Sequence, residues 1–247
     1  GGPAPTQWQP VPTYFERLAE EGVSSAVVSP ARFAGSGLTG AALRGARHVP
    51  ADTLEQRVSA ALRELRAGTP VVYLYWSEID HSGHAHGVAS DAWIGQVEQF
   101  DAGLAMLMRG LPSGVRVVLT ADHGMINVEP DRIIDVASTP ALREGVRIVA
   151  GETRAAHVHA EEGRADEVEE RWRETLGESA WVLSRAQMPA LIGEGSGASV
   201  IGDLLVLARG CGGVVDSRTQ SAAAIAMPGI HGSVTPTEMR IPVVTLS

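Results

Sequence analysis

Five residues that commonly bind metal ions lie in three separated segments of the chain, each close to the end of an apolar run. Asp80 and His84 lie in the first segment, Asp122 and His123 in the second, and His231 in the third. Carboxylates and imidazoles together suit Zn²⁺ and its neighbours in the periodic table. Five ligands are more than one tetrahedral ion needs, so they predict two divalent metal ions, zinc by ligand type. Such a site is typical of hydrolysis, above all of a phosphate ester.

Two buried strands are predicted to bring these residues together. Residues 70–76 and 115–119 are almost entirely apolar, as expected of parallel strands covered on both faces. A long amphipathic helix over 90–109 separates them. Strand, helix and strand in this order predict an α/β fold, with a mostly parallel doubly wound sheet and helices on both faces. Because ligands bind beyond the carboxyl ends of such strands, Asp80 and Asp122 should reach the same edge.

The residues next to these ligands indicate how the backbone must run. Neighbouring side chains of a strand point to opposite faces, so Asp122 and His123 can share a site only where the strand has ended. Gly124 permits that turn. Gly83 and Gly87 are predicted to loosen the backbone around His84 in the same way.

The remaining elements predict a core and an insertion. The core, 1–130 and 215–247, should begin with a linker over 1–12 and contain helices at 13–21, 40–44 and 52–67, strands at 25–29 and 241–246, and a loop at 33–40. The insertion, 131–214, reads as a small α+β unit. It should contain strands at 146–150, 156–160 and 180–183, a helix at 165–176, a loop at 192–200, and a hairpin between 203–208 and 213–216.

Composition narrows the classes of function. The net charge is −9, which argues against a broad nucleic-acid-binding surface. All basic residues are arginine, so mechanisms that need a lysine are excluded. Cys211 is the single cysteine, and no apolar run reaches membrane-spanning length. We therefore expect no nucleic-acid or membrane partner, and the absence of a signal peptide favours the cytoplasm.

Three short motifs carry a resemblance to a known family: Asp80-x-x-Gly83-His84-x-x-Gly87, Ala121-Asp122-His123-Gly124-Met125 and His231-Gly232. They resemble the metal-binding motifs of the alkaline phosphatase superfamily, and most closely its nucleotide pyrophosphatase/phosphodiesterase branch. The resemblance implies that Asp80, His84 and His231 hold one zinc ion and that Asp122 and His123 hold the other. It also implies a small phosphate ester or nucleotide as substrate.

The family pattern has two earlier parts that we do not find. One is an Asp on the first strand that binds the second metal, and the other is a Thr or Ser nucleophile at a helix N-terminus. Thr39 is the only tempting hydroxyl before the first motif, and it reads better as a helix cap or turn residue. We therefore expect the nucleophile upstream of Gly1, in an N-terminal part of the same protein, and expect the chain alone to be poorly active.

Several alternatives stay open. The same metal-binding motifs serve phosphomonoesterases, phosphonate hydrolases and phosphomutases, and a non-catalytic metal-binding remnant would also fit the absent nucleophile. Further polar residues read more simply as structural. His81 and His86 are expected to be exposed loop residues, and a strand face that carries His157 and His159 is expected to be solvated, although with Arg154 it could meet a substrate phosphate.

Overall fold

The computed structural model describes residues 4–195, 197 and 200–247. The chain divides into two compact units. Unit 1 comprises residues 1–79, 95–118 and 245–247, and unit 2 comprises residues 80–94 and 119–244. All five candidate ligands therefore belong to unit 2, and their mutual geometry can be described within one unit.

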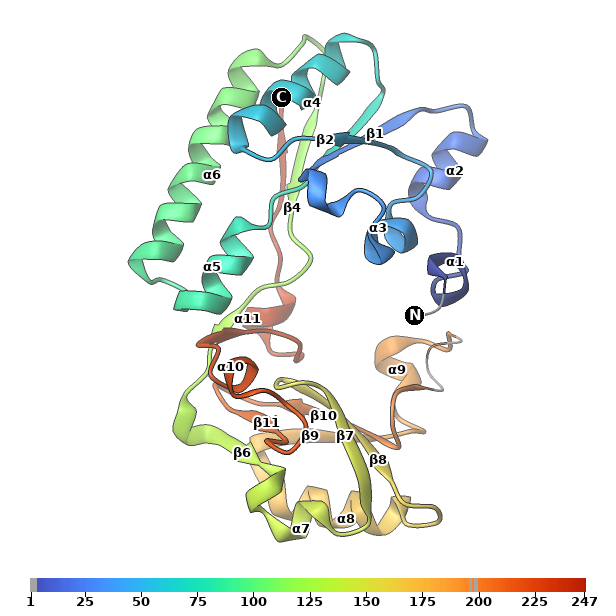
Figure 1. Cartoon of the computed structure of the whole chain (residues 1–247), viewed down its shortest axis with the longest axis vertical. Coiled ribbons are helices and arrows are strands. Elements are labelled where there is room, and N and C mark those ends of the chain that lie inside the picture. Colours follow the sequence, from blue (N-terminus) through green and yellow to red (C-terminus); the bar gives the residue numbers. More distant parts are fainter. Residues whose placement is uncertain (1–3, 196, 198–199) are drawn as a thin grey trace. The chain divides into compact units, whose positions relative to one another are not determined.

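Unit 1 is built on a parallel sheet with the strand order β2-β1-β3 (Figure 1). The central strand β1 (Ser25–Ser29) is buried throughout and pairs in parallel with β2 (Arg47–Pro50) and β3 (Val71–Leu74). Helix α4 (Leu54–Arg66) packs on this sheet through small apolar residues. The predicted α/β class with parallel strands is confirmed.

Two helices of unit 1 begin at threonine caps. Thr13 accepts a hydrogen bond from the backbone N–H of Glu16 at the start of α2 (Tyr14–Glu20), and Thr53 caps α4 in the same way. The expected linker over 1–12 is partly helical, because α1 spans Pro5–Trp8, while residues 1–3 lie outside the described part. Unit 1 also contains η1 (Ala31–Phe33) and α3 (Gly37–Ala42), as well as most of α6 (Asp91–Gly110), which begins in unit 2.

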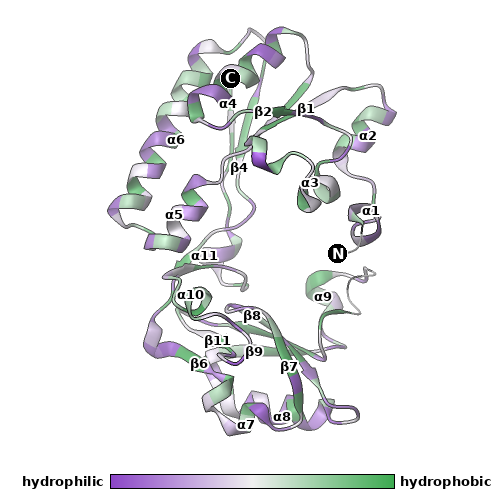
Figure 2. Cartoon of the chain, in the orientation of Figure 1, coloured by the Kyte–Doolittle hydropathy of each residue, from purple (hydrophilic) through white to green (hydrophobic). Residues whose placement is uncertain are grey.

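Unit 2 contains a four-stranded antiparallel sheet in the order β7-β8-β10-β9. Helix α8 covers one face, and Trp172 is fully buried there and donates its indole N–H to the carbonyl of Leu142. Figure 2 shows the apolar residues along these strands and the mixed faces of α8. The predicted strands and helix of this region are present as β7 (Val146–Glu152), β8 (Ala155–Ala160), α8 (Ala165–Leu176) and β9 (Ala180–Ser184).

The predicted hairpin between residues 203–208 and 213–216 is wrong. Strand β10 (Leu204–Ala208) lies between β8 and β9, whereas β11 (Gly213–Val215) pairs in parallel with β6 (Ile133–Asp135). The chain between β10 and β11 therefore changes sheets instead of folding back. The sequence signal misled because two short apolar runs around a glycine-rich turn look alike whether they pair with each other or with distant strands.

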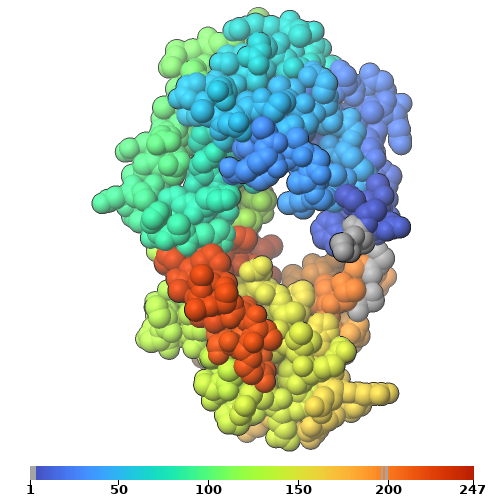
Figure 3. All heavy atoms as spheres, in the orientation of Figure 1, coloured from blue at the N-terminus to red at the C-terminus, as the bar shows by residue number. Residues whose placement is uncertain are grey.

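Two further strand pairs lead to the candidate ligands. Strand β4 (Val117–Thr120) pairs with β13 (Val243–Leu246), and β5 (Ile126–Asn127) pairs antiparallel with β12 (Gly229–Ile230). The short helices of unit 2 are η2 (Pro130–Arg132), η3 (Val136–Ser138), α7 (Pro140–Arg143), η4 (Gly177–Ser179), α9 (Pro189–Ile192), α10 (Ala222–Ile225) and α11 (Pro236–Met239). Figure 3 shows the segment around α10 on the visible face of unit 2.

The predicted division into a core and an insertion stays a prediction. The two compact units are defined by contacts within the chain, and this does not test whether one segment is inserted into another domain. The expected loop over 192–200 begins at the end of α9, and its residues 196, 198 and 199 lie outside the described part. None of the helices in the described ranges combines the length and the apolar character that a membrane span requires.

Candidate metal centre

The first motif lies on a helix, not in the loop that its glycines predicted. Helix α5 spans Glu78–His86, so Asp80 and His84 are one turn apart and lie on the same face. Gly83 is inside this helix, and only Gly87, with φ +86°, leaves the helical conformation. The spacing of the two ligands was itself a helical signal that the glycines obscured.

Close packing between α5 and β12 explains the buried glycine. A Cβ atom on Gly229 would lie 2.2 Å from the carbonyl oxygen of Gly83, and one on Gly83 would lie 2.4 Å from the Sδ of Met125. The two backbones can approach this closely only without side chains between them. His231, the residue directly after β12, is thereby brought to the face of α5 that carries Asp80.

Asp80, His84 and His231 converge on one point, and we call them the triad. One ligand atom from each lies within 4.8 Å of the other two. Oδ1 of Asp80 is 3.4 Å from Nε2 of His84 and 3.8 Å from Nε2 of His231. Two tetrahedral ligands about 2.0 Å from a zinc ion are separated by about 3.3 Å, so these spacings suit one small divalent cation.

The protonation of His84 strengthens this interpretation. Its Nδ1 lies 2.8 Å from the carbonyl oxygen of Gly229, and because a carbonyl can only accept, Nδ1 must carry the hydrogen. In a neutral imidazole, Nε2 then presents a lone pair toward the triad. Oδ1 of Asp80 is buried and has no hydrogen-bond partner among the described residues. A buried carboxylate oxygen that faces an imidazole lone pair calls for a cation between them.

Asp122 and His123, which we call the pair, follow the end of β4 as predicted. Nδ1 of His123 donates to the carbonyl of Gly124 at 2.9 Å, so Nε2 is again the free ligand atom, 3.6 Å from Oδ1 of Asp122. The His123 ring stacks on the His231 ring with centroids 3.5 Å apart. The pair therefore lies directly beside the triad, although the Asp122 side chain is 86% exposed.

The surroundings of His231 favour its neutral, metal-binding form. Burial lowers its pKa, the positive charges that His123 and His84 could carry lower it further, and Asp80 and Asp122 oppose the shift. Stacked imidazoles cannot both be charged at low cost. This arrangement suits nitrogen ligands that are held ready for a cation.

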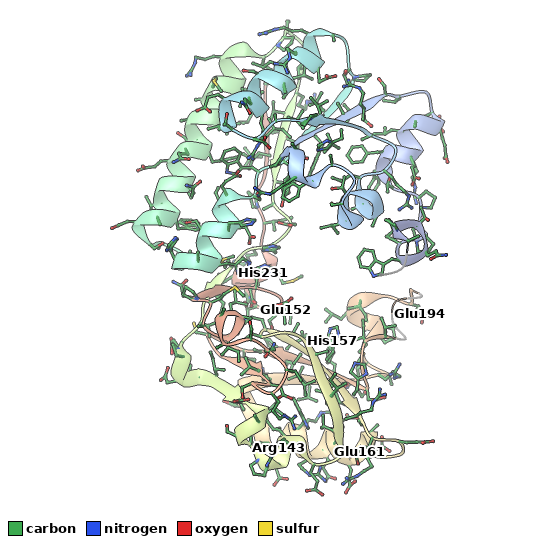
Figure 4. All side chains as sticks on the ribbon, in the orientation of Figure 1. Arg143, Glu152, His157, Glu161, Glu194 and His231 are labelled. Atoms are coloured by element: carbon green, nitrogen blue, oxygen red, sulfur yellow. The ribbon has the colours of Figure 1, made fainter. Side chains whose placement is uncertain are left out.

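A pocket of about 560 Å³ opens over the triad. Besides the three ligands it is lined by His81, Ala85, Glu152, Met227 and Ile230. Figure 4 shows Glu152, at the end of β7, beside His231. Sequence analysis missed Glu152, because no motif marks it and its approach to the triad depends on the sheet of unit 2. His81 and His86 are exposed as expected, but both lie on helix α5 and not in a loop, and His81 reaches the pocket wall.

Arg154 cannot meet a substrate phosphate, contrary to the alternative raised from the sequence. Its guanidinium is fully buried and pairs with Glu238. His157 and His159 are half-buried on β8. The pKa of His157 is lowered, mainly because the ring is buried and to a smaller extent because His159 can carry a positive charge beside it. Thr39 lies in the first turn of α3, whose N-cap is Ser36: the Ser36 hydroxyl accepts from the backbone N–H of Thr39 and donates to its hydroxyl at 3.0 Å, so Thr39 is a turn residue and not the cap.

Comparison with known proteins identifies the family. The sequence profile of the type I phosphodiesterase / nucleotide pyrophosphatase family matches residues 3–232. The chain belongs to this family. A curated relative, the bis(5'-adenosyl)-triphosphatase ENPP4 of Bos taurus, is 30% identical over 96 residues, which are 35% of this chain and 21% of that protein. The resemblance to the alkaline phosphatase superfamily that the motifs carried is thereby confirmed.

Solved structures share the fold. Murine ectonucleotide pyrophosphatase/phosphodiesterase 5 superposes with a TM-score of 0.71 at 19% identity, over 92% of this chain and 61% of that one. The human protein of the same name gives 0.75 at 16% identity, over 98% and 64%. Phosphonoacetate hydrolase from Sinorhizobium meliloti 1021 gives 0.70 at 19% identity, over 95% and 68%. The chain spans about a fifth of the curated relative and under two thirds of the two phosphodiesterases.

Proposed function

We propose that this chain forms the metal-binding and substrate-binding part of a hydrolase that acts on phosphate diesters or nucleotide pyrophosphates. The observation that carries the proposal is the convergence of the triad from two segments about 150 residues apart in sequence, with the stacked His123 ring beside it. Family membership supports the reaction type, since the matching family is a phosphodiesterase and nucleotide pyrophosphatase family.

The residues have separate tasks in this proposal. Asp80, His84 and His231 hold one divalent cation, and Asp122 and His123 contribute two ligands to a second. The carboxylates offset the positive charge, and the hydrogen bonds to the carbonyls of Gly229 and Gly124 fix the rings so that Nε2 faces inward. When bound, two such cations supply charge stabilisation for the attacking and leaving oxygens of a phosphoryl transfer.

The ligand types favour zinc. The five residues offer imidazole nitrogens and carboxylate oxygens, and zinc sites need only a few such ligands. A covalent step would need a Thr or Ser nucleophile. An inactive threonine-to-alanine variant of murine ectonucleotide pyrophosphatase/phosphodiesterase 5 has been solved in complex with AMP, which supports a threonine in that role for the family. We propose no nucleophile among the residues of this chain.

The pocket supports a small-molecule substrate. A space of about 560 Å³ accommodates a nucleotide-sized ligand, because ligand pockets span about 300–1,000 Å³. Its wall combines apolar Met227 and Ile230 with the carboxylate of Glu152. Glu152 would accept a hydrogen bond from a substrate hydroxyl or amine and would repel a further anionic group.

The test compares three classes of substrate with the zinc-loaded full-length protein, because we propose no nucleophile among the residues of this chain. The proposal expects turnover of bis(p-nitrophenyl) phosphate and thymidine 5'-monophosphate p-nitrophenyl ester to exceed that of p-nitrophenyl phosphate. Faster turnover of the monoester, or release of phosphate from phosphonoacetate, would move the assignment to another branch of the superfamily. Zinc binding without turnover of any substrate would favour a non-catalytic metal-binding protein.

A further inference from the structure

A buried ion pair between Arg154 and Glu238 is linked to the segments that carry His231 and His123. Arg154 and Glu238 are 0% and 1% exposed. Nε of Arg154 donates to Oε1 of Glu238 at 3.0 Å and Nη2 donates to Oε2 at 2.7 Å, so the two groups meet in a forked arrangement. The third guanidinium nitrogen donates to the carbonyl of Gly212 at 2.5 Å. Neither charge is left without a partner in the interior.

Glu238 also holds the segment that follows His231. The backbone N–H of Ser233 donates to Oε1 of Glu238 at 3.0 Å, and the hydroxyl of Thr235 donates to Oε2. The hydroxyl of Ser233 in turn donates to the carbonyl of Ala208 at 2.7 Å. One carboxylate therefore fixes the backbone two residues beyond a member of the triad.

The same residue holds the segment that carries the pair. The backbone N–H of Gly124 donates to the carbonyl oxygen of Glu238 at 2.7 Å. A Cβ atom on Gly124 would lie 2.0 Å from the carbonyl oxygen of Thr237, so α11 is pressed directly against the backbone after His123. Glu238 thus contacts both ligand-bearing segments, one through its side chain and one through its backbone.

We propose that Glu238, held by Arg154, is a positioning residue that sets the distance between His231 and His123. The stacking of these rings at 3.5 Å requires the two segments to keep a fixed spacing, and the ion pair is where both are anchored. A buried charge pair resists small displacements, because any movement leaves a charge without its partner. This proposal rests on the proposed function in one respect only, which is that His231 and His123 are metal ligands.

Amide exchange in the metal-free protein tests the positioning directly. Glu238→Gln keeps the shape but turns an acceptor toward Arg154 into a donor. We expect the amides of Ser233 and Gly124 to exchange at least about tenfold faster than in the wild type, relative to amides inside the sheet such as that of Val206. Gly124 is the decisive amide, since its own acceptor is a backbone oxygen that the substitution leaves in place.

Two further variants separate positioning from general stability. Leu142→Ala opens a cavity in the distant core beside Trp172, so its destabilisation should speed exchange of Val206 and Gly124 together and leave their ratio unchanged. Arg154→Lys keeps the positive charge and should give a change intermediate between wild type and Glu238→Gln. It also provides a measurement if the glutamine variant does not fold.

Zinc affinity, measured by competition with a chelator at a temperature where each variant is folded, gives the second readout. We expect Glu238→Gln to lower the affinity about 10–100-fold, as loss of a supporting contact does at other metal sites, and Leu142→Ala to leave it unchanged. Unchanged exchange at Gly124, or faster exchange with unchanged zinc affinity, would overturn the proposal. Failure of the wild type to bind zinc would refute the proposed function, while the exchange ratio alone would then decide whether Glu238 positions the two segments.

Discussion

The triad and the pair lie next to each other, yet their surroundings differ. In the triad a carboxylate oxygen is buried without a hydrogen-bond partner among the described residues, and three ligand atoms face one point. In the pair the carboxylate of Asp122 is 86% exposed, and only two ligand atoms come together. Under the proposed function, the difference implies that the triad would supply most of one cation site and the pair only a part of a second.

Removing a triad ligand should have the largest effect. His84 and His86 share helix α5, but only His84 faces Asp80, while His86 is exposed. We expect His84→Ala to lower zinc affinity by about 100-fold or more, since loss of a supporting contact alone costs 10–100-fold. His86→Ala is the matched control and should bind as the wild type does. Equal losses in both variants would show that zinc binds the helix nonspecifically.

Removing the pair should separate the two sites. We expect the double variant Asp122→Asn with His123→Ala to lose binding of a second zinc equivalent. The affinity for the first equivalent should fall by less than about tenfold, because tenfold is the smallest loss expected when a contact that supports a metal ligand is removed. Titration calorimetry would give both stoichiometry and affinity. Loss of both equivalents together would mean that the triad and the pair form one inseparable site.

The sequence predicted the proximity of the five candidate ligands better than the elements that carry them. Residue types and their positions after apolar runs were enough to select the five candidates, and the family resemblance grouped Asp80, His84 and His231, which converge in the structure. The helix under Asp80 was missed, because Gly83 reads locally as a helix breaker. Its real role, the close approach to Gly229, depends on a contact between segments far apart in the chain.

Contacts made through backbone atoms were beyond sequence reasoning. Nothing in the sequence tells that the carbonyl of Gly229 orients His84, or that Gly124 rests on α11. The role of Arg154 was hidden for a related reason. Its position near His157 left a phosphate contact open as an alternative to a solvated strand face, whereas its partner Glu238 lies 84 positions away in the sequence, and no local pattern links the two.

The glycines at the contact between α5 and β12 test whether this contact sets the spacing of the triad ligands. Gly229→Ala would push a methyl group against the backbone oxygen of Gly83, so α5 and β12 must separate, whereas Gly83→Ala meets the movable thioether of Met125. We expect a destabilisation of about 1–3 kcal/mol for Gly229→Ala, with weaker zinc binding. The change for Gly83→Ala should be smaller. Thermal unfolding with and without zinc measures both, and the reverse order would show that the contact is not what sets the ligand spacing.

Acid provides the mildest way to loosen the support that the triad and the pair share. Burial alone would raise the pKa of Glu238, but hydrogen bonds from Arg154, Thr235 and Ser233 outweigh it, so the pKa is lowered from its usual 4.5. A lowered carboxyl pKa stabilises the fold at pH values above 4.5, and that contribution is lost as pH falls through the folded-state pKa.

Glu238→Gln removes this titration, so the free energy of unfolding should depend less steeply on pH below about 4.5 in the variant than in the wild type. Urea unfolding of the metal-free proteins between pH 3 and 7 would measure it, without interference from zinc-bound histidines. Parallel curves for the two proteins would mean that the pKa of Glu238 is the same in the folded and unfolded states. The ion pair would then contribute nothing to holding the two ligand groups together.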